Sequence, residues 1–270
     1  MALTEFQRRV CRLLAKQRIQ CGDAYVAGAA ALNLWLNAPR ISGDLDLFHD
    51  TVEAVARTWE QDTAALEGAG LSVRVVIERP GFVRAIVADT DGQLLLEWLR
   101  DSAFRFFPLV THGELGLSLH PFDLATNKVL ALIGRLEVRD WIDVIECDSR
   151  LQPLGYLAWA ACGKDPAFSP PSLLAQASRS GRYGREEIET LAFAGSPPDA
   201  AELHRRWHAM LDRAGEIVSI LPAEQVGKCV LGKDGKPMRD EPAGLRRALD
   251  ANEITFHSGS IGGALPQIVS

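Results

Sequence analysis

The sequence predicts an α/β (α+β) fold, with a small mixed sheet flanked by helices and then a mostly helical C-terminal domain. Two observations support this prediction. In the first hundred residues, helix-like and strand-like patterns alternate and then give way to three strand-like runs, which is not a regular βαβ repeat. From residue 121 onward the pattern is mostly helical. We therefore expect three regions, at residues 1–118, 119–226 and 227–270.

The first region should begin with an amphipathic helix, with Thr4 as its candidate N-cap. In chain order, the expected elements are a helix at 4–20, a strand at 24–27, a helix at 29–37, a strand at 43–48, a helix at 52–66, and strands at 71–78, 82–88 and 93–99. The turn sequences RPG and DTDG separate the last three strands, so we expect hairpins there.

The second region should be a set of helices. They are expected at 121–135, 137–150, 156–162, 172–180, 185–194 and 199–221. The sequence GSPP at 195–198 breaks the helical pattern. The tail from residue 227 has hairpin chemistry in KCVLGKDGKPM, a short helix and a Gly-rich end.

Composition limits the class of protein. A formal net charge of −6 gives no support for a wide nucleic-acid-binding surface, although it leaves room for a local basic cleft. The five cysteines form no CxxC pair, which predicts free thiols in a reducing compartment. No run approaches the roughly 20 apolar residues of a membrane span, and the N-terminus lacks the pattern of a signal peptide. We therefore expect a cytoplasmic protein without a membrane partner.

The candidate metal site is the sequence DLDLF. Asp44 and Asp46 are two apart on a strand, so their side chains point to the same face and could share a metal ion. Glu97, a lone acid in an apolar strand, is the candidate third carboxylate. The alternatives are a half-buried strand with a solvated face for the two aspartates, and a charge on an edge strand for Glu97.

The candidate phosphate site precedes these acids. Gly28 ends a strand and opens a helix, where free backbone N–H groups and the helix dipole favour phosphate. Arg40 and Ser42 come just before the aspartates, where they could touch a nucleotide or orient the loop. The alternatives are a simple strand-to-helix turn for Gly28 and a surface charge for Arg40.

A second block lies on the predicted helix pair. Lys128 and Arg135 are seven apart and share a helix face, so both could neutralise phosphate oxygens. Asp140 and Asp143 share a face of the next helix, with Arg139 beside them. The alternative is a network of salt bridges between the two helices.

Together these blocks resemble a known family. The order strand–Gly, helix, Arg-x-Ser-x-Asp-x-Asp over residues 22–50, and the spaced Lys, Arg and Arg-Asp-x-x-Asp over 120–146, are similar to nucleotidyltransferases of the polymerase-β-like superfamily. Within that superfamily the chain more closely resembles the AbiEii/AbiGii toxin family.

The resemblance implies a nucleotidyltransferase core with several assigned residues. Two Mg²⁺ ions would be held by Asp44, Asp46 and Glu97, and a nucleoside triphosphate (NTP) would place its phosphates over Gly28 and Ala29. It implies that Lys128 contacts the triphosphate, with Arg135 beside it, and that Asp140 lies near the catalytic centre. It also implies a tRNA acceptor and a cognate antitoxin as partners.

The sequence departs from the family at the first glycine. The family usually has Gly-Ser or Gly-Gly-Thr where this chain has Gly28–Ala29–Ala30. One hydrogen bond from a hydroxyl to a charged oxygen is therefore missing, a loss of roughly 1.5–3 kcal/mol if uncompensated.

Three functions remain open. The first is a metal-dependent nucleotidyltransferase acting on a hydroxyl of tRNA, protein or a small molecule, with a toxin–antitoxin or phage-defence role as one option. The second is a catalytically weak or inactive module of the same fold that binds a nucleotide or a partner. The third, a DxD glycosyltransferase, would need a nucleotide-binding βαβ half that the pattern lacks.

Overall fold

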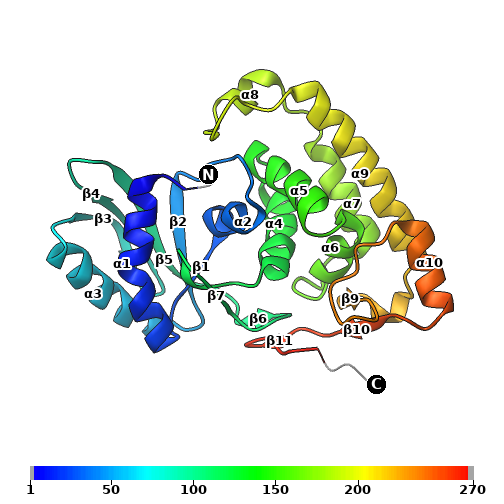
Figure 1. The fold of residues 1–270 in the computed structure, drawn as a ribbon, viewed down its shortest axis with the longest axis horizontal. Coiled ribbons are helices and arrows are strands. Elements are labelled where there is room, and N and C mark those ends of the chain that lie inside the picture. The colour runs from blue at the N-terminus through cyan, green and yellow to red at the C-terminus, as the bar shows by residue number, and fades with distance from the viewer. Residues whose placement is uncertain (1–2, 267–270) are drawn as a thin grey trace. The chain divides into compact units, whose positions relative to one another are not determined.

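The computed structural model describes residues 3–266, which divide into two compact units (Figure 1). Unit 1 takes in the residues up to Ala103, together with Leu109–His120 and Ala192–Gly195. Unit 2 takes in Phe104–Pro108, Pro121–Leu191 and the residues from Ser196 onward. No described helix is long and apolar enough to cross a membrane.

Unit 1 is built on a seven-stranded mixed sheet with the strand order β3-β4-β5-β2-β1-β8-β7. The strands are β1 (Tyr25–Ala27), β2 (Asp44–His49), β3 (Ser72–Arg79), β4 (Phe82–Ala88), β5 (Gln93–Arg100), β7 (Val110–His112) and β8 (Gly116–Ser118). The chain segment β3–β4–β5 is an antiparallel meander, as the turn sequences predicted, and β5 then pairs in parallel with β2. The predicted mixed sheet is confirmed.

Three helices belong to this unit: α1 (Glu5–Cys21), α2 (Gly28–Leu36) and α3 (Val52–Gly68). Local signals explain their ends. Thr4 and Gln7 form a capping box at the start of α1, and Thr51 caps α3 by accepting a hydrogen bond from the Ala54 amide. Asn37 ends α2 in the left-handed conformation, which asparagine tolerates better than most residues.

One face of the sheet is the core of unit 1. Leu45 and Leu47 of β2 and Trp98 of β5 are fully buried there, and the indole N–H of Trp98 donates to Asp62 of α3 at 2.8 Å. Because strand side chains alternate, the residues between them point to the opposite face, where they are only half-buried. This second face carries the predicted carboxylates.

Unit 2 is mostly helical, as predicted. Its elements are β6 (Phe104–Arg105), α4 (Pro121–Arg135), α5 (Val138–Arg150), α6 (Leu154–Ala161), α7 (Pro170–Ala177), α8 (Arg185–Glu189), α9 (Ala200–Ile220), β9 (Cys229–Leu231), α10 (Pro242–Asp250), β10 (Thr255–His257) and β11 (Ser260–Ile261), with short 3₁₀ turns at Ser178–Ser180 and Ala223–Gln225. Tyr156 and Trp159 of α6 pack with Ile217 of α9 in a buried apolar cluster.

The structure differs from the sequence prediction at two places in unit 2. The hairpin sequence at 228–238 does turn back, with a bridge from Leu231 to Pro237, but β9 has β10 as its strand partner. The predicted helix at 185–194 ends at Glu189. Further along, the Ala192 carbonyl accepts from the Ile41 amide and the Ala194 amide donates to the Pro39 carbonyl, so this segment pairs with the loop at residues 39–41 instead of continuing the helix.

Candidate functional site

The predicted carboxylates occupy the half-buried face of the sheet in unit 1. Asp44 and Asp46 lie on β2, an inner strand, and Asp46 is in direct register with Glu97 on β5. Neighbouring strands are about 4.8 Å apart, so side chains in register are close together. Because β5 lies between β4 and β2, the edge-strand alternative for Glu97 is wrong.

The Asp46 side chain leaves no room for a side chain at position 28. Gly28 opens α2 with φ +67°, and a Cβ built on it would stand 1.8 Å from the Asp46 Oδ2 atom. The carboxylate therefore packs directly against the backbone at the start of α2. Ala27, at the N-cap position of this helix, makes no side-chain capping hydrogen bond. The helix start and the carboxylates thus form one local site, in which Ala29 occupies the first turn of α2.

In the loop before β2, Arg40 and Ser42 are buried, and hydrogen bonds fix the loop. Ser42 Oγ donates to Asp44 Oδ1 at 2.6 Å, and its own carbonyl accepts from Gln7 Nε2 at 2.6 Å. The carbonyl of Arg40 accepts from Asn33 Nδ2 at 3.1 Å. Arg40 is only 3% exposed, so the surface-charge alternative is wrong. The Ser42 hydroxyl thus contacts a carboxylate of β2, a role that the sequence analysis did not assign to it.

Sequence reasoning missed the supporting residues. Gln7 of α1 and Asn33 of α2 hold the loop by side-chain hydrogen bonds. A segment much later in the sequence, residues 192–194, holds it by backbone hydrogen bonds. There the Ile41 amide donates to the Ala192 carbonyl at 2.9 Å, and the Ala194 amide donates to the Pro39 carbonyl at 2.8 Å. Asn33, a lone polar residue in the apolar helix GAAALNLWL, was the one available signal.

Glu97 is engaged by an arginine that the sequence analysis did not consider. Arg84 of β4 is in register with Glu97, and its Nη2 and Nε atoms lie 2.5 and 2.6 Å from Glu97 Oε1. No three His, Cys, Asp or Glu side chains are gathered as a metal would require within residues 3–266. The donor set of three carboxylates on adjoining strands nevertheless has the oxygen chemistry that Mg²⁺ prefers.

The second predicted block is gathered in unit 2. Lys128 Nζ lies 2.9 Å from Asp140 Oδ1 and 3.1 Å from Asp143 Oδ2. Arg135 donates to both oxygens of Asp140, at 2.9 and 3.0 Å. Both aspartates are buried, and Arg139 pairs with Glu137 at 2.5 Å. The sequence analysis gave a network of salt bridges between the two helices as the alternative interpretation of this block. Such ion pairs are present between α4 and α5. The three carboxylates and Gly28 belong to unit 1, and this lysine cluster belongs to unit 2.

The charge environment favours the ionised form of Asp140. Burial alone would raise the pKa of its carboxyl group. The charge of Lys128 and hydrogen bonds from Arg135 and Lys128 outweigh burial, so the pKa lies below its usual value. Asp140 is therefore a fixed negative charge between two cations at neutral pH.

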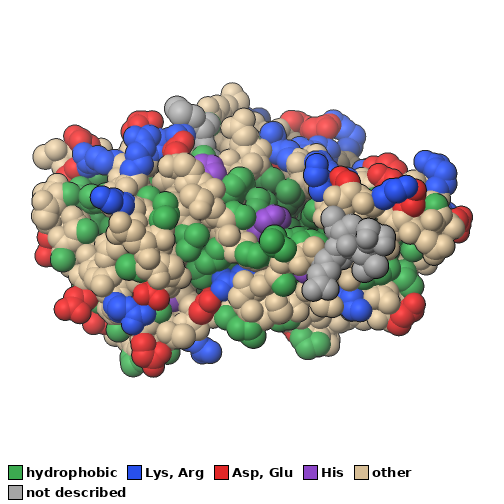
Figure 2. All heavy atoms as spheres, turned by 60° about the horizontal axis from the view of Figure 1, so that its bottom comes forward, with side chains coloured by type: hydrophobic (Ala, Val, Ile, Leu, Met, Phe, Trp, Pro, Cys, Tyr) green, Lys and Arg blue, Asp and Glu red, His purple; other side chains and the backbone are tan. Residues whose placement is uncertain are grey.

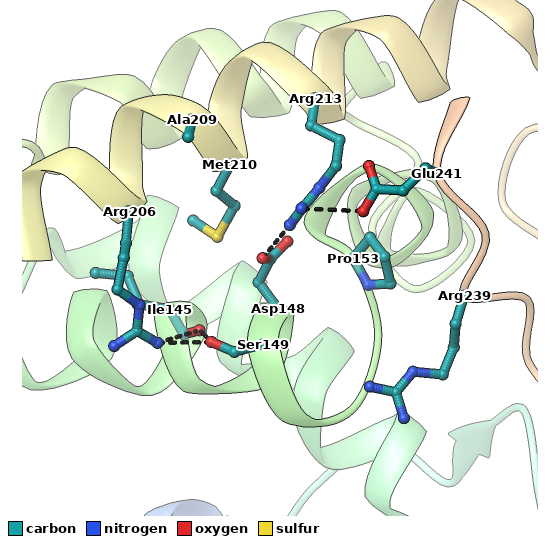
Figure 3. A pocket seen from close by; sticks show the side chains of 10 residues that line it. All are labelled: Ile145, Asp148, Ser149, Pro153, Arg206, Ala209, Met210, Arg213, Arg239 and Glu241. Carbon is teal, nitrogen blue, oxygen red and sulfur yellow. Dashed lines mark hydrogen bonds and ion pairs between the residues drawn. The ribbon is translucent and has the colours of Figure 1, made fainter. Parts of the chain in front are cut away.

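A separate cavity of about 360 Å³ lies within unit 2, between α5, α9 and the chain around Arg239 (Figure 3). Arg213 bridges Asp148 and Glu241, and Arg206 donates to Ser149 at 2.6 Å. The cavity contains none of the predicted site residues. The arginines of α9 are thus paired with acids and polar groups. On the face seen in Figure 2, basic and acidic side chains are likewise interspersed.

Comparison with known proteins places the fold. No family model and no curated protein matches the sequence. MenT4, a nucleotidyltransferase toxin from Mycobacterium tuberculosis H37Rv, is similar with a TM-score of 0.55 and 21% identity, over 81% of this chain and 83% of that one. JHP933 from Helicobacter pylori gives 0.53 and 17%, over 80% and 95%. A second H. pylori structure, provisionally described as a nucleotidyltransferase, gives 0.51 and 16%, over 79% and 95%. The chain therefore has the nucleotidyltransferase fold that its sequence predicted.

Proposed function

We propose that the protein is a metal-dependent nucleotidyltransferase that transfers a nucleoside monophosphate from an NTP to a hydroxyl acceptor. The observation that most supports this is the packing of Asp46 against Gly28, with Glu97 in register beside it. This arrangement joins carboxylates to a helix start, and Mg²⁺–triphosphate chemistry requires both. The fold likeness agrees with the proposal.

In this proposal Asp44, Asp46 and Glu97 would hold Mg²⁺, which would supply stabilisation of the charge that develops on the phosphate oxygens. The acceptor oxygen attacks the α-phosphorus, the bond to the β-phosphate breaks and pyrophosphate leaves. Glu97 takes the proton from the acceptor hydroxyl. Ser42 keeps Asp44 in the required rotamer through its 2.6 Å hydrogen bond.

The triphosphate is proposed to lie over the backbone of Gly28 and Ala29. Neither Ala29 nor Ala30 offers a hydroxyl, so the N–H groups at the start of α2 supply the hydrogen bonds there. Within unit 2, we keep Lys128 and Arg135 as the phosphate-neutralising residues that the sequence resemblance implies, with Asp140 holding both cations. Because MenT4 is described as a nucleotidyltransferase toxin, we extend the proposal to a toxin role. The sequence resemblance adds tRNA as the proposed acceptor and an antitoxin as the proposed partner.

The test is incubation with each labelled NTP, Mg²⁺ and total tRNA, comparing wild type with Asp44→Ala. We expect label on RNA or on protein with wild type only. Asp50→Asn is the matched control, since Asp50 comes just after the same strand and accepts a hydrogen bond from the Tyr25 hydroxyl at 3.0 Å. Absence of label on every acceptor, with every NTP, would overturn the proposal.

The second candidate is a non-catalytic module of the same fold. The alanines after Gly28 and the pairing of Glu97 with Arg84 favour it. It predicts that Asp44→Ala binds triphosphate as tightly as wild type does and that neither transfers it. The fold likeness gives no support to the glycosyltransferase alternative.

A further inference from the structure

The pairing of Arg84 with Glu97 bears directly on the proposed metal site. Both contacting nitrogens of Arg84 lie within 2.6 Å of the same oxygen, Oε1. The Glu97 side chain is 14% exposed and that of Arg84 is 37% exposed, so the pair is partly shielded from water. Asp46 stands in register on the other side of Glu97. Glu97 therefore lies between a cation already present and the proposed metal ligands.

We propose that Arg84 is a positioning residue that sets the metal affinity of this site by competing for Glu97. This inference rests on the proposed function. A carboxylate carries one negative charge, and a guanidinium held on it weakens its attraction for a second cation. A divalent ion beside Asp46 would also repel the guanidinium. Metal binding and the Arg84–Glu97 ion pair therefore oppose each other.

Arg84 has a second contact besides Glu97. The Arg84 Cζ atom is 5.5 Å from the centre of the Phe82 ring, and Arg79 lies at 4.9 Å from the same ring. Phe82 precedes Arg84 by two residues on β4, so both side chains lie on the same face of the sheet. A guanidinium released from Glu97 can remain over this ring, where a cation is favoured. The change needs only a side-chain movement, because the ring contact already exists.

The test is Mn²⁺ binding in the absence of nucleotide, measured by calorimetry or by the electron paramagnetic resonance signal of free Mn²⁺. We expect Arg84→Met to bind Mn²⁺ about fivefold more tightly than wild type, the upper range for a partly exposed ion pair. The matched control is Arg74→Met. Arg74 is exposed on β3 and lies on the same face of the sheet. The strand register aligns it with Asp44, with β4 and β5 between their two strands. Removal of the Arg74 charge should change the Mn²⁺ affinity less than twofold, because solvent and salt screen charge interactions over that distance.

A double-mutant cycle separates competition for Glu97 from a general charge effect. In a Glu97→Gln background, Arg84→Met should change Mn²⁺ affinity less than twofold, since no carboxylate is left to compete for. Equal tightening in both backgrounds would overturn the inference. So would wild-type or weaker Mn²⁺ affinity of Arg84→Met with an unchanged circular dichroism spectrum.

The same titrations keep the two proposals distinguishable. If wild type binds Mn²⁺, Asp44→Ala does not, and Arg84→Met equals wild type, the metal site stands and only the role of Arg84 fails. If only Arg84→Met binds Mn²⁺ measurably, the result supports the inference, because Arg84 then prevents measurable Mn²⁺ binding in wild type. If neither protein binds, the metal site and the role of Arg84 are both overturned.

Discussion

At the scale of single residues, Gly28 shows how one missing side chain shapes the candidate site. Its positive φ angle is common among glycines, and Gly22 at the end of α1 has nearly the same value, +69°. The difference lies in the surroundings. A Cβ at Gly22 would meet nothing within 4 Å, whereas a Cβ at Gly28 would overlap the Asp46 carboxylate. Gly28 is therefore required for close approach as well as for its backbone conformation.

This comparison gives a matched pair of variants. Gly22→Ala should lower the free energy of unfolding by about 1–2 kcal/mol, because only the left-handed backbone is penalised. Gly28→Ala should cost more and should also abolish Mn²⁺ binding, since Asp46 must move. Urea unfolding and Mn²⁺ titration of both variants measure this. Equal effects of the two substitutions would contradict the role assigned to Gly28.

His49, the last residue of β2, predicts a pH dependence of stability. It is fully buried, with Nε2 2.6 Å from Thr58 Oγ1, and burial lowers its pKa to about 4. The unfolded chain has a histidine pKa of about 6.5. Between these values the unfolded state binds more protons, so stability is full above about pH 6.5 and falls as the pH drops toward 4. The loss in free energy of unfolding should reach about 3 kcal/mol near pH 4.

Urea unfolding from pH 7.5 to pH 4.5 measures this slope. His49→Gln should remove most of it. His208→Gln is the control, because His208 is exposed on α9 and should leave the slope unchanged. A slope that persists in His49→Gln would assign the titration to another group.

At the scale of elements, the helix pair α4–α5 is held together by buried charges. Lys128 on α4 pairs with Asp140 and Asp143 on α5, and both aspartates have less than 2% of their side-chain surface exposed. Removing one partner of a buried ion pair costs far more than the pair contributes in net terms, because it leaves a charge without compensation. These helices are thus joined by electrostatics as well as by apolar packing.

Lys128→Met should therefore lower the free energy of unfolding by about 3–5 kcal/mol at pH 7. Arg135→Met should cost about 1 kcal/mol, because the Arg135 side chain is 45% exposed and its charge is screened. Urea unfolding of both variants, beside wild type, gives the comparison. A Lys128→Met protein as stable as wild type would show that this lysine is not needed to neutralise the aspartates.

The pH dependence gives a second check on Lys128→Met. The pKa of Asp140 is lowered in the folded protein, so its contribution to stability is present above the unfolded value of about 3.9 and is lost as the pH falls below it. Loss of Lys128 removes the largest of the interactions that lower this pKa, so the pKa of Asp140 should be higher in the variant than in wild type. The stability difference between wild type and variant should then shrink as the pH is lowered from 7 to 4.

At the scale of the whole molecule, residues 192–195 connect distant parts of the chain. They follow α8 in sequence, yet they belong to the compact unit of the sheet, where Phe193 bridges to Arg40. The loop before Asp44 is therefore held by residues about 150 positions further along the chain. A proposed metal ligand and a segment of the helical half of the sequence are thereby linked through backbone hydrogen bonds.

Ala194→Pro tests this link, because proline removes the amide that donates to the Pro39 carbonyl. We expect faster hydrogen exchange at the Ile41 amide, which donates to Ala192, and a stability loss of about 0.5–1.5 kcal/mol. Ala200→Pro is the control, since Ala200 is the first residue of α9, where proline is tolerated. Unchanged exchange at Ile41 in Ala194→Pro would show that the segment does not support the loop.

Much of the fold was predictable because its signals are local. The helix at Pro121–Arg135 has the bounds expected from its periodicity, and the meander of three strands follows from its turn sequences. The prediction failed where a distant partner decided the outcome. Residues 192–194 do not continue the helix, because they form backbone hydrogen bonds with the loop at residues 39–41.

For the candidate site, the sequence by itself determined that Asp44 and Asp46 share a face, since side-chain alternation depends only on the strand that contains them. Tertiary structure alone decided that Asp46 packs on Gly28 and stands beside Glu97. It also decided that Arg84 holds Glu97. Strand order brings these residues together from positions up to about 70 apart in the chain. That order depends on long-range pairing and burial, which no local pattern encodes.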